Sequence, residues 1–205
     1  MIANTATDIN QTEGVVLRTF PSGESDMVLR VLSPLYGKFS LLAKHIRSSK
    51  KRFSGNIEIF DRGIFLLNRR NSTKSLKNNL RILESFEAAH AAFSLRESLI
   101  KLSVASLLSE AFDLIIKEEQ DNENDRLSYY ETFILSLQAI EESQEKNDLL
   151  KTCFLSLKAL MCLAGFIAKE QVAIPNKKNL FILLNHIEDC AEKKLLAREL
   201  IDKMI

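Results

Sequence analysis

The 205-residue sequence has little glycine and proline, with six and three residues, and it has no tryptophan. The glycines stand at positions 14, 23, 37, 55, 63 and 165. At these positions neither G-x-x-x-x-G-K nor G-x-G-x-x-G can be written. Such glycine-rich loops let the backbone approach the phosphates of nucleotides closely. We therefore expect no use of ATP or of a dinucleotide.

Cysteine and histidine are also scarce, with three residues each. The cysteines lie in stretches of helical periodicity and form no C-x-x-C pair, which zinc sites and redox motifs use. The histidines are too scattered to form a ligand set. The residues are Cys153, Cys162, Cys190, His45, His90 and His186. We expect buried free thiols, no metal and no cofactor.

Long apolar runs and catalytic motifs are missing too. No run approaches the roughly 18 residues that span a bilayer, and the first ten residues do not resemble a secretory signal. No G-x-S-x-G or H-E-x-x-H motif can be found. The one compact polar group beside a turn is Glu24, Ser25 and Asp26, which we interpret as capping the next strand. We expect a soluble cytoplasmic protein that is not an enzyme and has no small-molecule substrate.

The sequence does contain an uneven distribution of charge. The formal net charge is only +1, but residues 1–86 hold 14 Lys and Arg against 7 Asp and Glu, whereas residues 87–205 hold 14 against 20. The first part is therefore basic and the second acidic. A basic region needs an anionic partner or solvation.

The period of the apolar residues divides the chain in the same way. Period-two alternation and turn signals predict five strands, over 11–20, 26–32, 38–44, 57–68 and 75–84, with a bulge or bend at Gly63. Their short connections favour a small OB-fold barrel, in which Phe39, Leu41 and Ala43 face inward. From about residue 87 the period becomes 3.6, and 93–117 reads as one very apolar helix.

We therefore predict an α+β protein, with an N-terminal five-stranded OB-fold barrel followed by an all-helical bundle. The predicted domains are a flexible lead-in over 1–11, the barrel over 12–86 and the helical domain over 87–205.

Two basic segments belong to the barrel. The first follows the third strand without an intervening acid, and the second lies in or after the fourth strand. Their residues are Lys44, Arg47, Lys50, Lys51 and Arg52, then Arg69, Arg70, Lys74 and Lys77. Basic loops with aromatics nearby are typical of single-strand binding, where cations follow the phosphates and rings stack on bases. Phe53 either stacks on bases or packs inward, and a solvated surface loop is the alternative for the whole basic run.

Several short segments carry a family resemblance. They are T-E-G-V-V-L-R from Thr12, the turn 23–26, Y-G-K-F-S-L-L-A-K over 36–44, the basic loop 47–53 closing on Ser54 and Gly55, and L-K-A-L-M-C-L-A-G-F over 157–166. Together they resemble the RecO family of bacterial recombination and DNA repair proteins, over roughly residues 11–166. The chain departs from the family in having no cysteine over 167–176, where many members carry a four-cysteine zinc module. It ends at Ile205, so we expect no basic C-terminal segment.

The resemblance implies a nucleoid-associated, non-enzymatic protein that binds single-stranded and double-stranded DNA and anneals complementary strands. It also implies RecR and single-stranded DNA-binding protein as partners in loading the recombinase. The acidic, apolar C-terminal tail of the latter would need an apolar groove with a positive rim. Candidates for the rim are Lys101, Arg126, Lys151 and Lys158, which are otherwise ordinary surface cations. Two other functions stay open, namely a protein-interaction scaffold without DNA annealing activity and an RNA-binding module.

Overall fold

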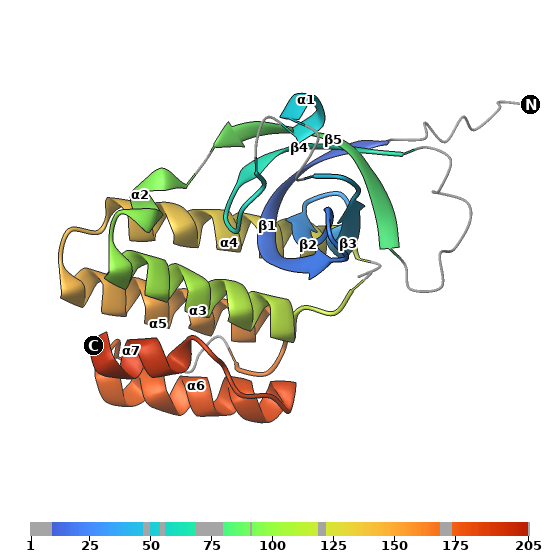
Figure 1. The fold of residues 1–205 in the computed structure, drawn as a ribbon. Helices are drawn as coiled ribbons and strands as arrows, with labels where there is room; N and C mark the ends of the chain where they lie inside the picture. Colours follow the sequence, from blue (N-terminus) through green and yellow to red (C-terminus); the bar gives the residue numbers. More distant parts are fainter. Residues whose placement is uncertain are drawn as a thin grey trace, which may run out of the picture.

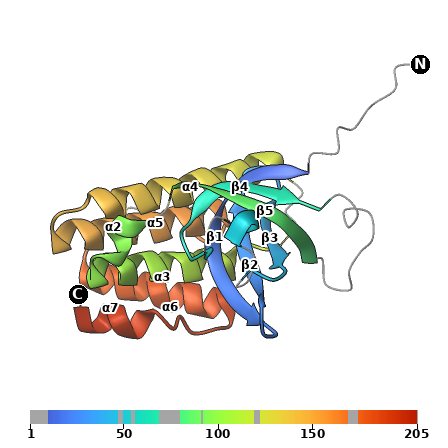
Figure 2. The ribbon, with the colours of Figure 1, turned by 45° about the horizontal axis from the view of Figure 1, so that its top comes forward.

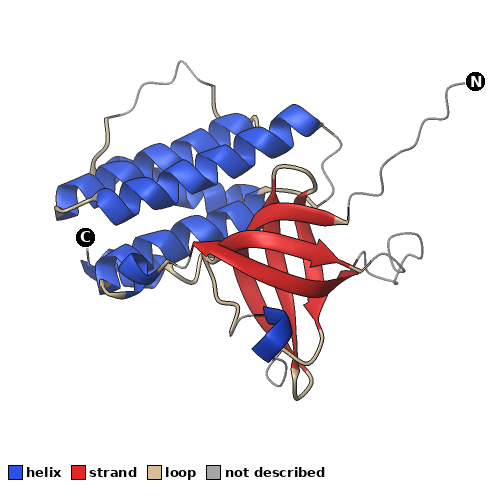
Figure 3. Cartoon of the chain, turned by 90° about the horizontal axis from the view of Figure 1, so that it is seen from above, coloured by secondary structure: helices blue, strands red, loops and turns tan. Residues whose placement is uncertain are grey.

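The computed structural model describes residues 10–46, 50–53, 56–68, 80–90, 92–118, 122–168 and 174–204. A β-barrel lies against one end of a layer of helices (Figures 1 and 3). The strands are β1 (Gln11–Ser22), β2 (Asp26–Ser33), β3 (Gly37–Ala43), β4 (Arg62–Leu67) and β5 (Leu80–His90). The helices are α1 (Lys50–Phe53), α2 (Phe93–Arg96), α3 (Leu99–Ile115), α4 (Glu123–Glu142), α5 (Lys146–Leu163), α6 (Lys177–Ala191) and α7 (Arg198–Met204).

The barrel is closed in the order β1-β2-β3-β5-β4. The β3–β5 pair is parallel, and β1 closes the barrel by pairing antiparallel with β4. This is the five-stranded Greek-key barrel of the OB-fold, with α1 between β3 and β4. The predicted fold class is confirmed, and Phe39, Leu41 and Ala43 lie in the barrel core as expected.

The limits of the fourth and fifth strands differ from the prediction. Residues 57–61 are not strand, because the Asp61 carboxylate accepts a hydrogen bond from the backbone N–H of Glu58 at 2.8 Å and closes a turn in which Phe60 has φ 74°. The β4–β5 register does shift at Gly63, as expected. A Cβ at this position would lie 2.1 Å from the carbonyl oxygen of Glu87, so only glycine fits. The fifth strand runs from Leu80 to His90 rather than ending at residue 84, and residues 75–79 lie outside the described residues.

The helical layer packs on the outer surface of the barrel. Val15, Leu17 and Leu32 point away from the barrel core and join the same hydrophobic cluster as the inward faces of α3, α4, α5 and α6. The helix expected over 93–117 is interrupted, since Ser98 accepts a hydrogen bond from the backbone N–H of Lys101 and starts α3 after the short α2.

The predicted domain boundary at residue 87 stays a prediction. No helix among those described has both the length and the apolar character needed to cross a bilayer.

A group of charged side chains also joins the barrel to the helices. We call Arg18, Arg30, Lys38, Asp113 and Glu118 the charge cluster. The Asp113 carboxylate, in the last turn of α3, lies 3.1 Å from Arg30 Nη1, 3.6 Å from Lys38 Nζ and 3.7 Å from Arg18 Nη1. A carboxylate at a helix C-terminus is repelled by the helix dipole, and these barrel cations offset that repulsion.

Lys38 is the most deeply buried cation of the charge cluster. Its ammonium group donates a hydrogen bond to the backbone carbonyl of Asp113 as well as pairing with the carboxylate. Burial lowers the pKa of Lys38, and the charge of Asp113 opposes that shift. The neighbouring guanidinium of Arg30 lowers the pKa further, so pairing with a carboxylate does not restore the ordinary pKa of this lysine.

The charge cluster predicts unequal effects of removing its two most buried members. Asp113→Ala removes the carboxylate that pairs with the buried Lys38, while Arg30 keeps Glu118, and should lower the free energy of unfolding by about 3–5 kcal/mol. Lys38→Met keeps most of the volume and leaves Asp113 with two arginines, so it should cost clearly less. Urea unfolding followed by circular dichroism measures both, with the exposed Asp202→Ala as a control. Equal losses for the two variants would contradict this account.

Candidate nucleic-acid interface

The outer face of β1, β2 and β3 carries two neighbouring rows of side chains. Arg18, Arg30 and Ser40 lie opposite one another across the strands and form the polar row. Phe20, Val28 and Leu42 lie opposite one another in the next row and form the apolar row. All three apolar side chains are half-buried, and the Arg18 and Arg30 side chains keep 35% and 25% of their surface exposed. This face therefore offers cations beside apolar surface.

The two arginines of the polar row should repel each other, because like charges directly opposite in a sheet are destabilising. Asp113 contacts both guanidinium groups and relieves this repulsion. The ring of Phe20 helps as well, since the Cζ atoms of Arg18 and Arg30 lie 5.2 and 6.0 Å from its centre. Phe20 therefore links the two rows.

The basic segments predicted from the sequence lie only partly within the described residues. Lys44 is exposed in the turn that directly follows β3. Lys50 and Lys51 are the first two residues of α1. Five residues lie outside the described part of the chain, namely Arg47, Arg69, Arg70, Lys74 and Lys77. Leu80, the first described residue after the second segment, pairs with Ser40 of the polar row. In OB-folds, the face of strands 2 and 3 and the β1–β2 and β4–β5 loops bind oligonucleotides.

Arg52, the remaining residue of the first segment, and the neighbouring Phe53 have structural contacts. Arg52 donates hydrogen bonds to the carbonyl oxygens of Glu84 and Leu83, at 2.9 and 3.2 Å, and so attaches α1 to β5 (Figure 2). Its guanidinium lies 4.8 Å from the centre of the Phe53 ring. Phe53 itself is 1% exposed and packs in the barrel core. Of the two alternatives for Phe53, the structure has inward packing.

Sequence reasoning missed Arg18, Arg30 and Phe20, because they stand singly within strands rather than in a basic run. A usable signal was present in the turn around Gly23. The hairpin pairs Ser22 with Asp26, and continuing that register places Phe20 opposite Val28 and Arg18 opposite Arg30. A prediction that starts from this turn therefore places the two arginines opposite each other.

The cations proposed as a partner-binding rim lie on three helices. Lys101 of α3 donates a hydrogen bond to the carbonyl oxygen of Glu141 at 2.6 Å. Arg126 of α4 packs over Gly37, since a Cβ there would lie 3.1 Å from its Cγ. Lys151 of α5 is exposed and lies 3.6 Å from Asp148, and Lys158 is half-buried on the same helix. Their role in partner binding stays a prediction.

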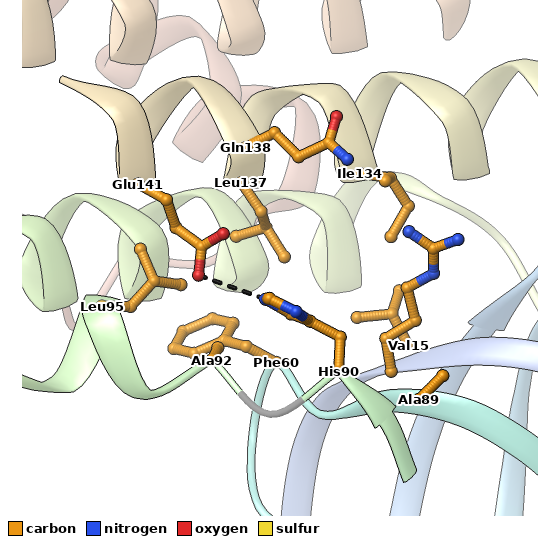
Figure 4. A pocket seen from close by; sticks show the side chains of 11 residues that line it. Val15, Phe60, Ala89, His90, Ala92, Leu95, Ile134, Leu137, Gln138 and Glu141 are labelled. Carbon is orange, nitrogen blue, oxygen red and sulfur yellow. Dashed lines mark hydrogen bonds and ion pairs between the residues drawn. The ribbon is translucent and has the colours of Figure 1, made fainter.

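A cleft of about 270 Å³ lies where β5, α2 and α4 meet (Figure 4). Its apolar lining includes Phe60, Leu95 and Leu137. Figure 4 shows His90 and Glu141 pointing toward each other, with His90 Nε2 3.4 Å from Glu141 Oε1. The same carboxylate oxygen accepts a 2.7 Å hydrogen bond from the Ser94 hydroxyl. The cleft thus lies between the barrel and the helices, and contacts of Glu141 with His90 and Ser94 cross it.

The described residues also bear on metal binding and thiol chemistry. Within them, no group of three or more His, Cys, Asp or Glu side chains is placed to hold a metal ion. Complete burial raises the pKa of Cys153 to about 12, so this thiol stays protonated near neutral pH.

The architecture is that of the OB-fold proteins, a class whose barrel face commonly binds oligonucleotides. Residues 8–108 match the family described as recombination protein O N terminal. The chain belongs to this RecO family.

Individual relatives agree with the family match. The chain is 29% identical over 134 residues to the DNA repair protein RecO of Thermoanaerobacter sp. strain X514, covering 65% of this chain and 50% of the relative. It is 28% identical over 155 residues to that of Desulfatibacillum aliphaticivorans, covering 75% and 56%. The Bifidobacterium adolescentis protein is 46% identical over 57 residues, covering 28% and 23%. The chain thus spans about half or less of the length of these curated relatives.

The inward position of Phe53 predicts a separation between stability and DNA binding. Phe53→Ala should lower the free energy of unfolding by about 3–5 kcal/mol, because a large core side chain is lost. Phe53→Leu should cost less and should leave affinity for single-stranded DNA within about twofold, since no stacked ring is removed. A stacking ring would contribute about 1–3 kcal/mol to binding. Normal stability with strongly weakened binding in Phe53→Leu would contradict inward packing.

Proposed function

We propose that this chain acts in DNA repair and homologous recombination as a non-enzymatic mediator. In this role it binds single-stranded and double-stranded DNA, anneals complementary strands and helps to load the recombinase together with RecR. The observation that carries the proposal is the outer β1–β2–β3 face, with the polar row of Arg18, Arg30 and Ser40 beside the apolar row led by Phe20. Membership of the RecO family supports it.

The geometry suits binding that does not depend on base sequence. Guanidinium and ammonium groups contact phosphates, which are the same at every nucleotide. The apolar row offers half-buried surface to sugars and bases, and stacking on such surface tolerates every base. A strand crossing β1, β2 and β3 would pass over both rows, with Lys44 exposed just after β3. A protein that holds strands in this way leaves the base edges free to pair, as annealing requires.

Two protein partners belong to the proposal. We propose RecR as one, and the acidic C-terminal tail of single-stranded DNA-binding protein as the other, with Lys101, Arg126, Lys151 and Lys158 as candidate contacts. Of these, Lys101 lies beside the cleft between β5, α2 and α4, since it donates a hydrogen bond to the backbone of Glu141, which lines that cleft. A pull-down with single-stranded DNA-binding protein that keeps or lacks its last residues tests this contact. We further propose a nucleoid-associated protein of the bacterial cytoplasm.

The first basic segment should weaken DNA binding when its charge is reversed. We expect Lys44→Glu, Lys50→Glu and Lys51→Glu together to reduce affinity for a labelled oligonucleotide, while Arg52 is kept because it attaches α1 to β5. Each lost phosphate contact removes about 0.7 from the slope of log affinity against log salt for a single strand. The triple variant should therefore flatten that slope by about 2, as measured by fluorescence anisotropy at several salt concentrations.

A matched control reverses three exposed lysines of the helical half, namely Lys178, Lys193 and Lys194. It has the same net charge as the first variant, so equal weakening by both would show a general charge effect rather than a contact. Failure of the unmodified protein to bind any oligonucleotide at low salt would overturn the proposed function. Competition by RNA of the same base sequence distinguishes DNA from RNA as the preferred strand.

A further inference from the structure

Glu118 reaches from the end of α3 onto the outer face of the barrel. Its Oε1 lies 3.3 Å from Arg30 Nη1 and accepts a 3.3 Å hydrogen bond from the Ser40 hydroxyl. Its backbone forms a parallel bridge with Lys38. The carboxylate is thus bound by one guanidinium and one hydroxyl group of the polar row. These are the donors with which proteins bind the phosphates of nucleic acids.

The contacts of Glu118 are weaker than those of Asp113. Its side chain is 38% exposed, whereas that of Asp113 is 6% exposed. Both contacts of 3.3 Å are longer than a good charge-assisted hydrogen bond of about 2.7–2.9 Å. The pair with Arg30 is made through Nη1, which also serves Asp113, rather than through the two-pronged fork that gives arginine its strongest pairs. Glu118 is therefore the carboxylate of the charge cluster that another anion can replace.

The charge balance favours exchange over addition. Arg18, Arg30 and Lys38 face Asp113 and Glu118, so three cations meet two anions. A phosphodiester carries one negative charge, as Glu118 does, and could take its place without changing that balance. Adding a phosphate while Glu118 stayed would place three anions around Arg30, and like charges at this distance repel.

We propose that Glu118 occupies a phosphate site on the barrel, formed by Arg30 and Ser40 with Arg18 beside them, and that a nucleic-acid phosphate displaces it. The site lies one row from Phe20, so a strand bound there would bring its next sugar or base over the apolar row. Glu118 then acts as an internal competitor that lowers affinity for nucleic acid. This inference rests on the proposed function and adds to it a defined phosphate position and its competitor.

Glu118→Gln tests the proposal, because the amide keeps the size and the hydrogen bond to Ser40 but removes the competing charge. We expect affinity for single-stranded oligothymidylate at low salt to rise about two- to fivefold, the range set by losing one partly exposed ion pair. The salt slope should also steepen by about 0.7. In the unmodified protein, the displaced Glu118 carboxylate binds a cation from solution, and this uptake offsets one counterion that the DNA releases. The uncharged glutamine binds no cation, so the full release is measured.

The matched control is Glu142→Gln, which makes the same change of charge at an exposed residue at the C-terminal end of α4. In an Arg30→Gln background the gain from Glu118→Gln should disappear, and thermal melting shows that each variant is folded. If DNA binds the unmodified protein but Glu118→Gln behaves like Glu142→Gln, or binds more weakly, the phosphate site is wrong while the proposed function stands. If neither the unmodified protein nor Glu118→Gln binds, both proposals are overturned.

Discussion

The desolvated carboxylate of Asp113 is the constraint on which the two halves of the molecule depend. It lies in the last turn of α3, where the helix dipole opposes a negative charge, and it is held there by cations from three barrel strands. The same carboxylate keeps Arg18 and Arg30 from repelling each other across β1 and β2. The paired arginines of the barrel would repel each other without Asp113, and Asp113 would be unfavourable at the end of α3 without the barrel cations. Hydrophobic contacts through Val15, Leu17 and Leu32 also join the halves.

This constraint also divides the outer barrel face into two parts. The part formed by Lys38 and the neighbouring end of the polar row lies against α3 and the residues after it. The part formed by Phe20, Val28 and Leu42 stays half-buried at the surface. In an isolated OB-fold the whole of this face could meet a ligand. Here the helical half covers one edge, and the apolar row is the part of this face that it leaves half-buried.

The sequence predicted the barrel well because strand alternation and turn residues are local signals. Phe39, Leu41 and Ala43 could be placed inward from period two alone, and Gly63 marked the irregular position in β4. The strand limits failed where a side chain overrode propensity, as when Asp61 closed a turn inside an apparently continuous strand. The charge cluster was beyond sequence reasoning, because Arg30 and Asp113 are 83 positions apart and no periodicity relates them. For the candidate site, the basic segments could be recognised because their cations are adjacent in the sequence. Pairing Arg18 with Arg30 requires knowledge of the β1–β2 hairpin register.

The closure of the barrel has a consequence for how the chain folds. The hairpins β1–β2 and β2–β3 join neighbours in sequence, but the barrel closes only when β1 pairs with β4 and β3 with β5. Gln11 must meet Leu66, and Ser40 must meet Leu80, so long loops are closed before these contacts are gained. Such non-local pairings slow folding relative to the local contacts of a helical bundle. During synthesis β1 leaves the ribosome well before its partner β4, so the edge of the first hairpin must wait unpaired until the fourth strand arrives.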